Sequence, residues 1–133
     1  MAEPNTHTAL IVVDHESRFP EANEMLLDVV AMVKRLSGLT RVYPAHMELA
    51  EPSIRQAFEA AVRDGAEAVV VHPYFLSPGR HSTTDIPRLV EEAAQAFPGV
   101  EHCVTAPLGV HDKIGEVILE RAGVPPVTVK ARR

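Results

Sequence analysis

Four apolar runs rich in β-branched residues recur along the chain, and each is followed by a longer amphipathic segment. The apolarity within a run is continuous rather than alternating, which is typical of parallel strands covered on both faces. Repeated strand–helix units with short connections predict an α/β fold: a doubly wound parallel sheet of about four strands flanked by helices, with right-handed crossovers. We expect the strands at residues 8–13, 41–45, 68–75 and 100–106.

The amphipathic segments carry the start and stop signals of helices. Pro20 can open the first helix, because the N–H that proline lacks would have no partner in a first turn. Gly38 and Gly65 end the first and second helices, since glycine readily adopts the positive φ of a helix C-cap. His111 is expected to cap or start the fourth. The predicted helices lie within residues 20–38, 51–65, 84–97 and 111–121, with a turn-rich loop at 77–82.

Length and charge limit the classes of protein to consider. The 133 residues suffice for one compact domain and are too few for two. We therefore expect a single domain over residues 1–133, with its core at 8–122 and a loose tail at 123–133. The net charge of −5 argues against binding to nucleic acid, and no apolar run is long enough to span a membrane.

Cysteine usage and the N-terminus indicate the compartment. Cys103 is the only cysteine, which excludes internal disulfides and a Cys-rich metal site within one chain. Its position within a predicted strand favours an inert buried thiol. Residues 1–8 are polar and lack the features of a signal or transit peptide. We expect a cytoplasmic protein, or a protein of an organelle stroma if a transit peptide was trimmed.

The first cluster of candidate site residues follows the first predicted strand, and ligands of such sheets bind beyond the carboxyl ends of the strands. His15 has an ordinary pKa near ~6.5, which suits proton transfer or metal binding; the alternative is a turn histidine that only forms hydrogen bonds. Asp14 could orient its imidazole or cap the next helix. Ser17 and Arg18, near a helix N-terminus, form a candidate carboxylate-binding pair, or the arginine only solubilises the surface.

The second cluster follows the second strand. His46 and Glu48 are two residues apart, so in an extended chain they would point the same way. One nitrogen and one oxygen ligand together suit a divalent transition metal. In the alternative interpretation, Glu48 and Glu51 only favour the positive N-terminal end of the second helix.

The third cluster lies in the loop at 77–82 after the third strand. Arg80 offers a planar fork of donors to a carboxylate, and His81 would project into the cavity that the strand ends enclose. Ser82 and Thr83 add hydroxyl groups that can bind a ligand or cap the next helix. His72, within the third strand, is interpreted as a core or rim histidine whose nitrogens form hydrogen bonds.

Several segments, in this order, resemble the short sirohydrochlorin chelatases. The resemblance extends from about Ala9 to Arg121, and matching motifs in one order are more specific than any single histidine. The sequence of residues 45–54 most resembles that of the family branch that inserts iron to make sirohaem. The matching segments are residues 12–18 (VVDHESR), 21–23 (EAN), 45–54 (AHMELAEPSI), 73–81 (PYFLSPGRH), 85–87 (DIP) and 106–111 (APLGVH).

This resemblance implies a chelatase-like parallel α/β fold of flavodoxin-like architecture, in a chain that forms a homodimer. It further implies insertion of a divalent metal into sirohydrochlorin without ATP, for sirohaem or cobalamin biosynthesis. Fe²⁺ is preferred over Co²⁺, the metal is a substrate, and no cofactor is tightly bound. The partner is therefore a polycarboxylate tetrapyrrole, and neither nucleic acid nor a membrane is expected.

The resemblance also assigns roles to individual residues. His15, Glu48 and His81 correspond to the catalytic and metal-binding residues of the family, and they are evenly spaced along the chain. Neutral imidazoles and a carboxylate can hold a divalent cation loosely and accept the pyrrole protons. The substrate carboxylates would be bound by the remaining candidates, which are Ser17, Arg18, Ser77, Arg80, Ser82 and Thr83.

Glu16 departs from the family pattern, which has glycine directly after the first histidine. If that glycine provides positive φ or room for the macrocycle, Glu16 should strain or obstruct the site. An alternative function is therefore a non-catalytic tetrapyrrole- or metal-binding relative impaired by Glu16. A flavodoxin-like signalling domain is a second alternative, but a phospho-receiver needs an acceptor aspartate after the third strand, where this chain has residues 73–75 (PYF).

Overall fold

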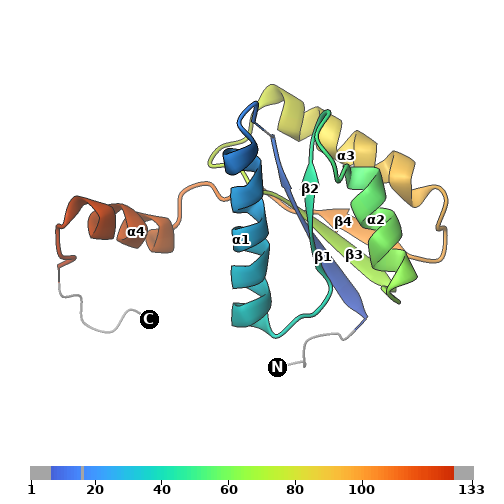
Figure 1. Cartoon of the computed structure of the whole chain (residues 1–133), viewed down its shortest axis with the longest axis horizontal. Helices are drawn as coiled ribbons and strands as arrows, with labels where there is room; N and C mark the ends of the chain where they lie inside the picture. Colours follow the sequence, from blue (N-terminus) through green and yellow to red (C-terminus); the bar gives the residue numbers. More distant parts are fainter. Residues whose placement is uncertain (1–6, 16, 128–133) are drawn as a thin grey trace.

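The computed structural model describes residues 7–15 and 17–127, and for residues 80–83 it describes the backbone alone. Four parallel strands form one sheet, as predicted (Figure 1), and their order in the sheet is β2-β1-β3-β4. β2 is an edge strand, which explains why it tolerates Pro44. The strands are β1 (Thr8–Asp14), β2 (Val42–His46), β3 (Ala68–Pro73) and β4 (Glu101–Val104).

Four helices alternate with these strands: α1 (Pro20–Ser37), α2 (Ile54–Arg63), α3 (Arg80–Ala94) and α4 (Asp112–Ala122). Gly38 ends α1 with a φ of 76°, and the side chain of His111 caps α4, as predicted. The expected start of the third helix at residue 84 is wrong, because α3 begins at Arg80. Hydroxyl-rich sequence favours loops and caps, but the buried side chains of Ile86 and Val90 hold this helix against the sheet.

The two faces of the sheet carry separate apolar clusters, because successive residues of a strand point to opposite faces. Ile11 and Val13 of β1 belong to the larger cluster, together with side chains of α2 and α3. Val12 of β1 belongs to a smaller one, with Leu26 and Val30 of α1. Thus α2 and α3 cover one face, and α1 lies on the other.

The C-terminal helix is arranged differently from the other three. In Figure 1, α4 stands apart from the sheet, beyond α1, and none of its residues is buried. Within the described part of the chain, no helix is long and apolar enough to cross a membrane. The predicted loose tail begins with residues 124–127, which are outside any helix or strand; its remainder lies outside the described residues.

Cys103 is exposed, so the prediction of a buried thiol is wrong. The residue before it, His102, faces α2 and α3, where its Nε2 lies 3.3 Å from Glu91 Oε2 and its ring meets that of Phe58. Cys103 therefore points to the opposite face of β4, the second edge strand of the sheet.

Candidate functional site at the carboxyl edge of the sheet

The register of β1 and β2 pairs Asp14 with His46 at the carboxyl ends of both strands. Asp14 Oδ1 lies 2.6 Å from His46 Nδ1. Phe19 is the N-cap of α1 and no side chain caps this end of the helix, so the interpretation of Asp14 as a helix cap is wrong. The His46 side chain is buried, and its backbone N–H donates to the carbonyl of Pro52 at 2.8 Å. This pair, of a buried histidine and a half-buried aspartate, joins the carboxyl ends of β1 and β2, where the first two clusters of candidate residues begin.

His15 leaves the end of β1 with an exposed side chain. Its imidazole lies against the ring of Phe75, which follows β3, with the ring centroids 4.7 Å apart and the planes tilted by 30°. The contact uses the ring face of the imidazole and fixes its position between two loops. An imidazole held in this way keeps nitrogens that can bind a ligand.

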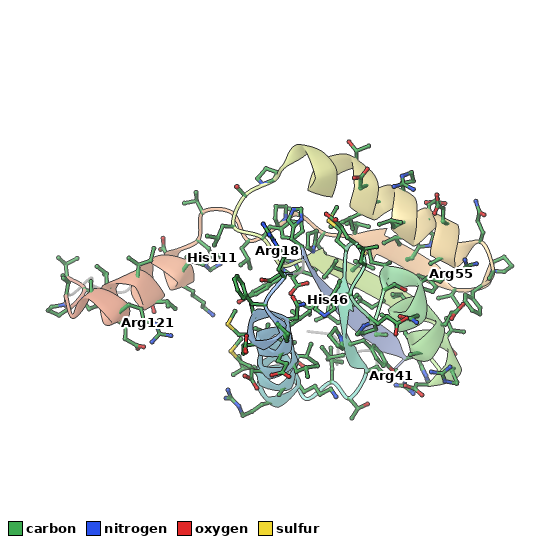
Figure 2. All side chains as sticks on the ribbon, turned by 45° about the horizontal axis from the view of Figure 1, so that its top comes forward. Arg18, Arg41, His46, Arg55, His111 and Arg121 are labelled. Atoms are coloured by element: carbon green, nitrogen blue, oxygen red, sulfur yellow. The ribbon has the colours of Figure 1, made fainter. Side chains whose placement is uncertain are left out.

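The loop that follows His15 is held by a side chain the sequence analysis did not single out. The backbone N–H of Ser17 donates to Asn23 Oδ1 at 2.6 Å, and Asn23 Nδ2 donates back to the Ser17 carbonyl at 2.9 Å. The Ser17 hydroxyl accepts from the N–H of Phe19 at 3.1 Å. Arg18, next in sequence, remains exposed at the start of α1 (Figure 2). Asn23 lies in segment 21–23, one of the segments that resemble the short sirohydrochlorin chelatases. That resemblance is the sequence signal that could have identified Asn23.

His46 and Glu48 both line one pocket but differ in exposure. The chain bends after β2, so His46 is buried and Glu48 is exposed. The backbone N–H of Met47 donates to the Asp14 carbonyl at 3.0 Å, which anchors the start of this bend. Of the two candidate ligands His46 and Glu48, Glu48 is therefore the one at the surface.

An open pocket of about 260 Å³ brings together residues of the first two clusters. Its lining consists of His15, Ser17, Arg18 and Glu48. Glu48 also lines a second pocket of about 240 Å³, which extends past His46 towards α2 and α3. The wall thus holds an imidazole, a carboxylate and a guanidinium, which can respectively accept a proton, attract a cation and bind an anionic group.

The third cluster is only partly described. Ser77 is exposed in the loop before α3, and the backbone places Arg80, His81, Ser82 and Thr83 in the first turn of α3. Their side chains, and the whole of Glu16, lie outside the described residues. Among the side chains that the structure does describe, no three histidine, cysteine, aspartate or glutamate residues gather to hold a metal ion.

Large apolar side chains stand exposed around this edge, one in the connection after each strand. Each is at least 68% exposed: Phe19, Leu49, Leu76 and Val110. Sequence reasoning missed this feature because each residue is isolated in the sequence. Together they give the edge that carries the polar pocket an apolar character, which a ligand or partner with apolar surface could use.

A parallel sheet with an imidazole, a carboxylate and a guanidinium at its carboxyl edge places the protein among the α/β proteins that bind ligands beyond their strand ends. Within that class, residues 9–123 match the model of the CbiX family, and the chain belongs to this family.

Two curated relatives differ in length. A chloroplastic sirohydrochlorin ferrochelatase of Arabidopsis thaliana is 52% identical over 112 residues, which cover 84% of this chain and 50% of the relative. A sirohydrochlorin cobaltochelatase of Methanocaldococcus jannaschii is 32% identical over 138 residues, which cover 86% of this chain and 96% of the relative. The chain thus spans about half of the plant relative and nearly all of the archaeal one.

Solved structures confirm the predicted fold. The sirohydrochlorin chelatase SirB from Bacillus subtilis subspecies spizizenii, in complex with cobalt, superimposes with a TM-score of 0.81 at 27% identity. The match covers 87% of this chain and 50% of SirB, again about half of the longer protein.

Proposed function

We propose that this protein inserts a divalent metal into sirohydrochlorin without ATP, with Fe²⁺ preferred over Co²⁺, for sirohaem or cobalamin biosynthesis. The observation that carries the proposal is the pocket shared by His15, Arg18 and Glu48 in a chain of this family. The names of the plant, archaeal and SirB relatives, all sirohydrochlorin chelatases, support the same reaction.

The reaction needs groups that handle a cation and protons together. Metalation removes two pyrrole protons while the ring nitrogens replace the water ligands of the metal. His15 and Glu48, with His81 as a third group, would hold the incoming cation loosely and accept these protons. Loose binding suits a metal that is a substrate, because it must leave for the macrocycle, and we propose no tightly bound cofactor.

The substrate is a flat apolar ring with carboxylate arms, and the site offers a partner to each part. Arg18 can pair with a carboxylate, and the net charge of −5 makes such local positive charge necessary. Ser17 and Ser77 add donors, as would Arg80, Ser82 and Thr83. The exposed apolar side chains around the edge, such as Leu49 and Leu76, provide a surface for the ring itself.

Three broader features complete the proposal. Residues 1–133 would act as one unit, and two such units as a homodimer. The chloroplastic plant relative supports an organelle stroma as one location, with the cytoplasm as the other. Sirohydrochlorin would be the small-molecule partner, without nucleic acid or membrane.

The test is anaerobic incubation of the protein with sirohydrochlorin and Fe²⁺ or Co²⁺, followed by absorption spectroscopy. We expect faster metalation than in the uncatalysed control. His15→Ala and His81→Ala should each reduce the rate by about a hundredfold or more, which is the range of a general acid–base group. His102→Ala is the matched control, because His102 faces α2 and α3. No acceleration with either metal would refute the enzymatic proposal.

The alternative function, tetrapyrrole or metal binding without turnover, depends on Glu16. It predicts tight binding of sirohydrochlorin with no metalation, and a gain of activity in Glu16→Gly. Equal rates for the wild type and Glu16→Gly, both above background, would exclude this alternative.

A further inference from the structure

His46 is the one polar residue among the buried residues that the structure describes. Its side chain is 6% exposed and that of Asp14 is 19% exposed, and the two are joined by the 2.6 Å contact between Nδ1 and Oδ1. Taking polar groups out of water costs free energy, and replacing a buried ion pair by apolar residues is often neutral or stabilising. Stability alone therefore does not explain why a histidine and an aspartate stand here.

The backbone of His46 holds both ends of the loop that carries Glu48. Residues 47–52 leave β2 directly after His46 and then return to it. The N–H of His46 donates to the carbonyl of Pro52 at 2.8 Å, and His46 forms a parallel β-bridge with Ser53. Glu48 lies between these two ends and is exposed. The position of Glu48 therefore depends on where His46 is held.

Asp14 connects this loop to the end of β1. Its carboxylate is bonded to the imidazole of His46, and its carbonyl accepts from the N–H of Met47 at 3.0 Å. His15 follows Asp14 directly in the chain. One residue thus carries two hydrogen bonds from the loop of Glu48 to the strand end that delivers His15.

A hydrogen bond fixes the relative position of two segments more closely than an apolar contact does. A carboxylate only accepts, so Nδ1 of His46 carries the hydrogen in its contact with Asp14. Such a bond requires a short distance and a nearly linear arrangement, whereas hydrophobic attraction has no direction. The Asp14–His46 pair therefore sets the spacing between the two strand ends, and with it the spacing between His15 and Glu48.

We propose that Asp14 and His46 are positioning residues for metal insertion: their hydrogen bond holds His15 and Glu48 at the separation that one divalent cation requires, before the substrate arrives. His15 and Glu48 line one pocket, and Glu48 and His46 line the next. Removing a residue that supports a metal ligand typically lowers metal affinity by about tenfold or more. The inference rests on the proposed function, and it gives neither residue a direct contact with the metal or the macrocycle.

Leucine and asparagine at position 46 separate the hydrogen bond from the space that the side chain fills. The two side chains have nearly the same shape. Asparagine can place its Nδ2 donor where Nδ1 of His46 lies, whereas leucine has no donor. A buried position favours leucine for stability, but positioning through Asp14 favours asparagine. A purely structural role and a positioning role thus predict opposite orders for His46→Leu and His46→Asn.

Co²⁺ is the probe, because its visible absorption depends on the number and arrangement of its ligands. In titrations without sirohydrochlorin, we expect a protein-dependent Co²⁺ spectrum for the wild type. His46→Leu should bind Co²⁺ about tenfold more weakly, and His46→Asn should stay within about threefold of the wild type. In the metalation assay, the KM for the metal should follow the same order, while the KM for sirohydrochlorin stays unchanged.

Asp14→Ala tests whether the two residues act as a unit. Alone, it should weaken Co²⁺ binding as much as His46→Leu does, and the double variant should bind no more weakly than either single variant. Tyr43→Phe is the matched control, because it also removes a 2.6 Å hydrogen bond to a carboxylate, that of Asp64, near the start of β2. It should leave the Co²⁺ spectrum and both KM values unchanged.

Three results would overturn the positioning role. They are a wild type that binds no Co²⁺ without sirohydrochlorin, equal Co²⁺ affinities for the wild type and His46→Leu, and weaker binding by His46→Asn than by His46→Leu. Additive losses in the double variant would show that Asp14 and His46 do not act through their shared bond. A wild type that binds Co²⁺ but accelerates no metalation would instead refute the proposed function, and the Co²⁺ titrations would still decide the positioning.

Discussion

The two faces of the sheet differ in how much helix covers them. On one face, α2 and α3 enclose a continuous core around Phe58, which is inaccessible to solvent. On the other, α1 encloses a smaller cluster around Leu26 and leaves β3 and β4 open. The candidate site lies at the edge where the two faces meet, with Asp14 and His46 pairing beneath it. Because the closed face contains the larger apolar cluster, we expect it to contribute more to stability than the open face.

Removing the largest buried side chain of the closed face should have the largest effect on stability. Phe58 stacks on Phe97 with ring centroids 6.0 Å apart. We expect Phe58→Ala to lower the free energy of unfolding by about 3–5 kcal/mol, because it leaves a cavity in a close-packed core. Urea denaturation measures this change. A loss below about 1 kcal/mol would mean that the closed face is not the stable half of the molecule.

The corresponding truncation on the other face is Leu26→Ala in α1. Leu26 is almost fully buried, but several of its neighbours are only partly buried and can move into the space. We therefore expect a loss of about 2–3 kcal/mol, in the lower part of the range for such substitutions. A loss equal to that of Phe58→Ala, in the same urea experiment, would remove the difference between the faces.

Local capping contributes less than packing on the closed face. Ser53 Oγ accepts from the N–H of Gln56 at 3.1 Å, and Gln56 Oε1 accepts from the N–H of Ser53 at 2.8 Å, which makes a capping box for α2. Ser53→Ala should cost about 1 kcal/mol in thermal or urea unfolding. Thr40→Ala, at an exposed position between α1 and β2, also removes a hydroxyl group. It is the matched control and should change stability by less than about 0.5 kcal/mol.

Much of the fold could be predicted because its signals are local. Continuous apolar runs predicted the strands. Pro20 and Gly38 predicted the two ends of α1, because proline fixes φ and glycine allows a positive φ in any surroundings. The start of α3 was missed because packing of Ile86 outweighed the loop preference of the preceding hydroxyl residues. The exposure of Cys103 was missed because it depends on β4 being an edge strand with one open face.

The candidate site could also be predicted only in part, because some of its contacts join residues that are far apart in the sequence. The order of strands and loops predicts that His15 and Glu48 lie at one edge, and they do line one pocket. The partner of Asp14 could not be predicted, because its pairing with His46 is set by the register of β1 against β2. Only the fold brings these two residues, far apart in sequence, within 2.6 Å.

The smallest expected effect is a pH dependence that belongs to the open face. Burial lowers the pKa of His72 below its usual 6.5, although a hydrogen bond with the backbone of Ala106 opposes the shift. Its Nδ1 lies 2.9 Å from Thr105 Oγ1, which anchors the imidazole between β3 and the chain beyond β4. Because the unfolded chain binds a proton at His72 more readily than the folded one, stability should fall as the pH drops below about 6.5.

His72→Gln keeps a polar side chain but removes the imidazole that binds the proton. The unfolding free energy of this variant should therefore fall less steeply than that of the wild type between pH 7.5 and 5.5. One group changes the slope by at most about 1.4 kcal/mol per pH unit. Exposed His7→Gln is the matched control and should retain the wild-type slope. Equal slopes for the wild type and His72→Gln would mean that folding does not lower the pKa of His72.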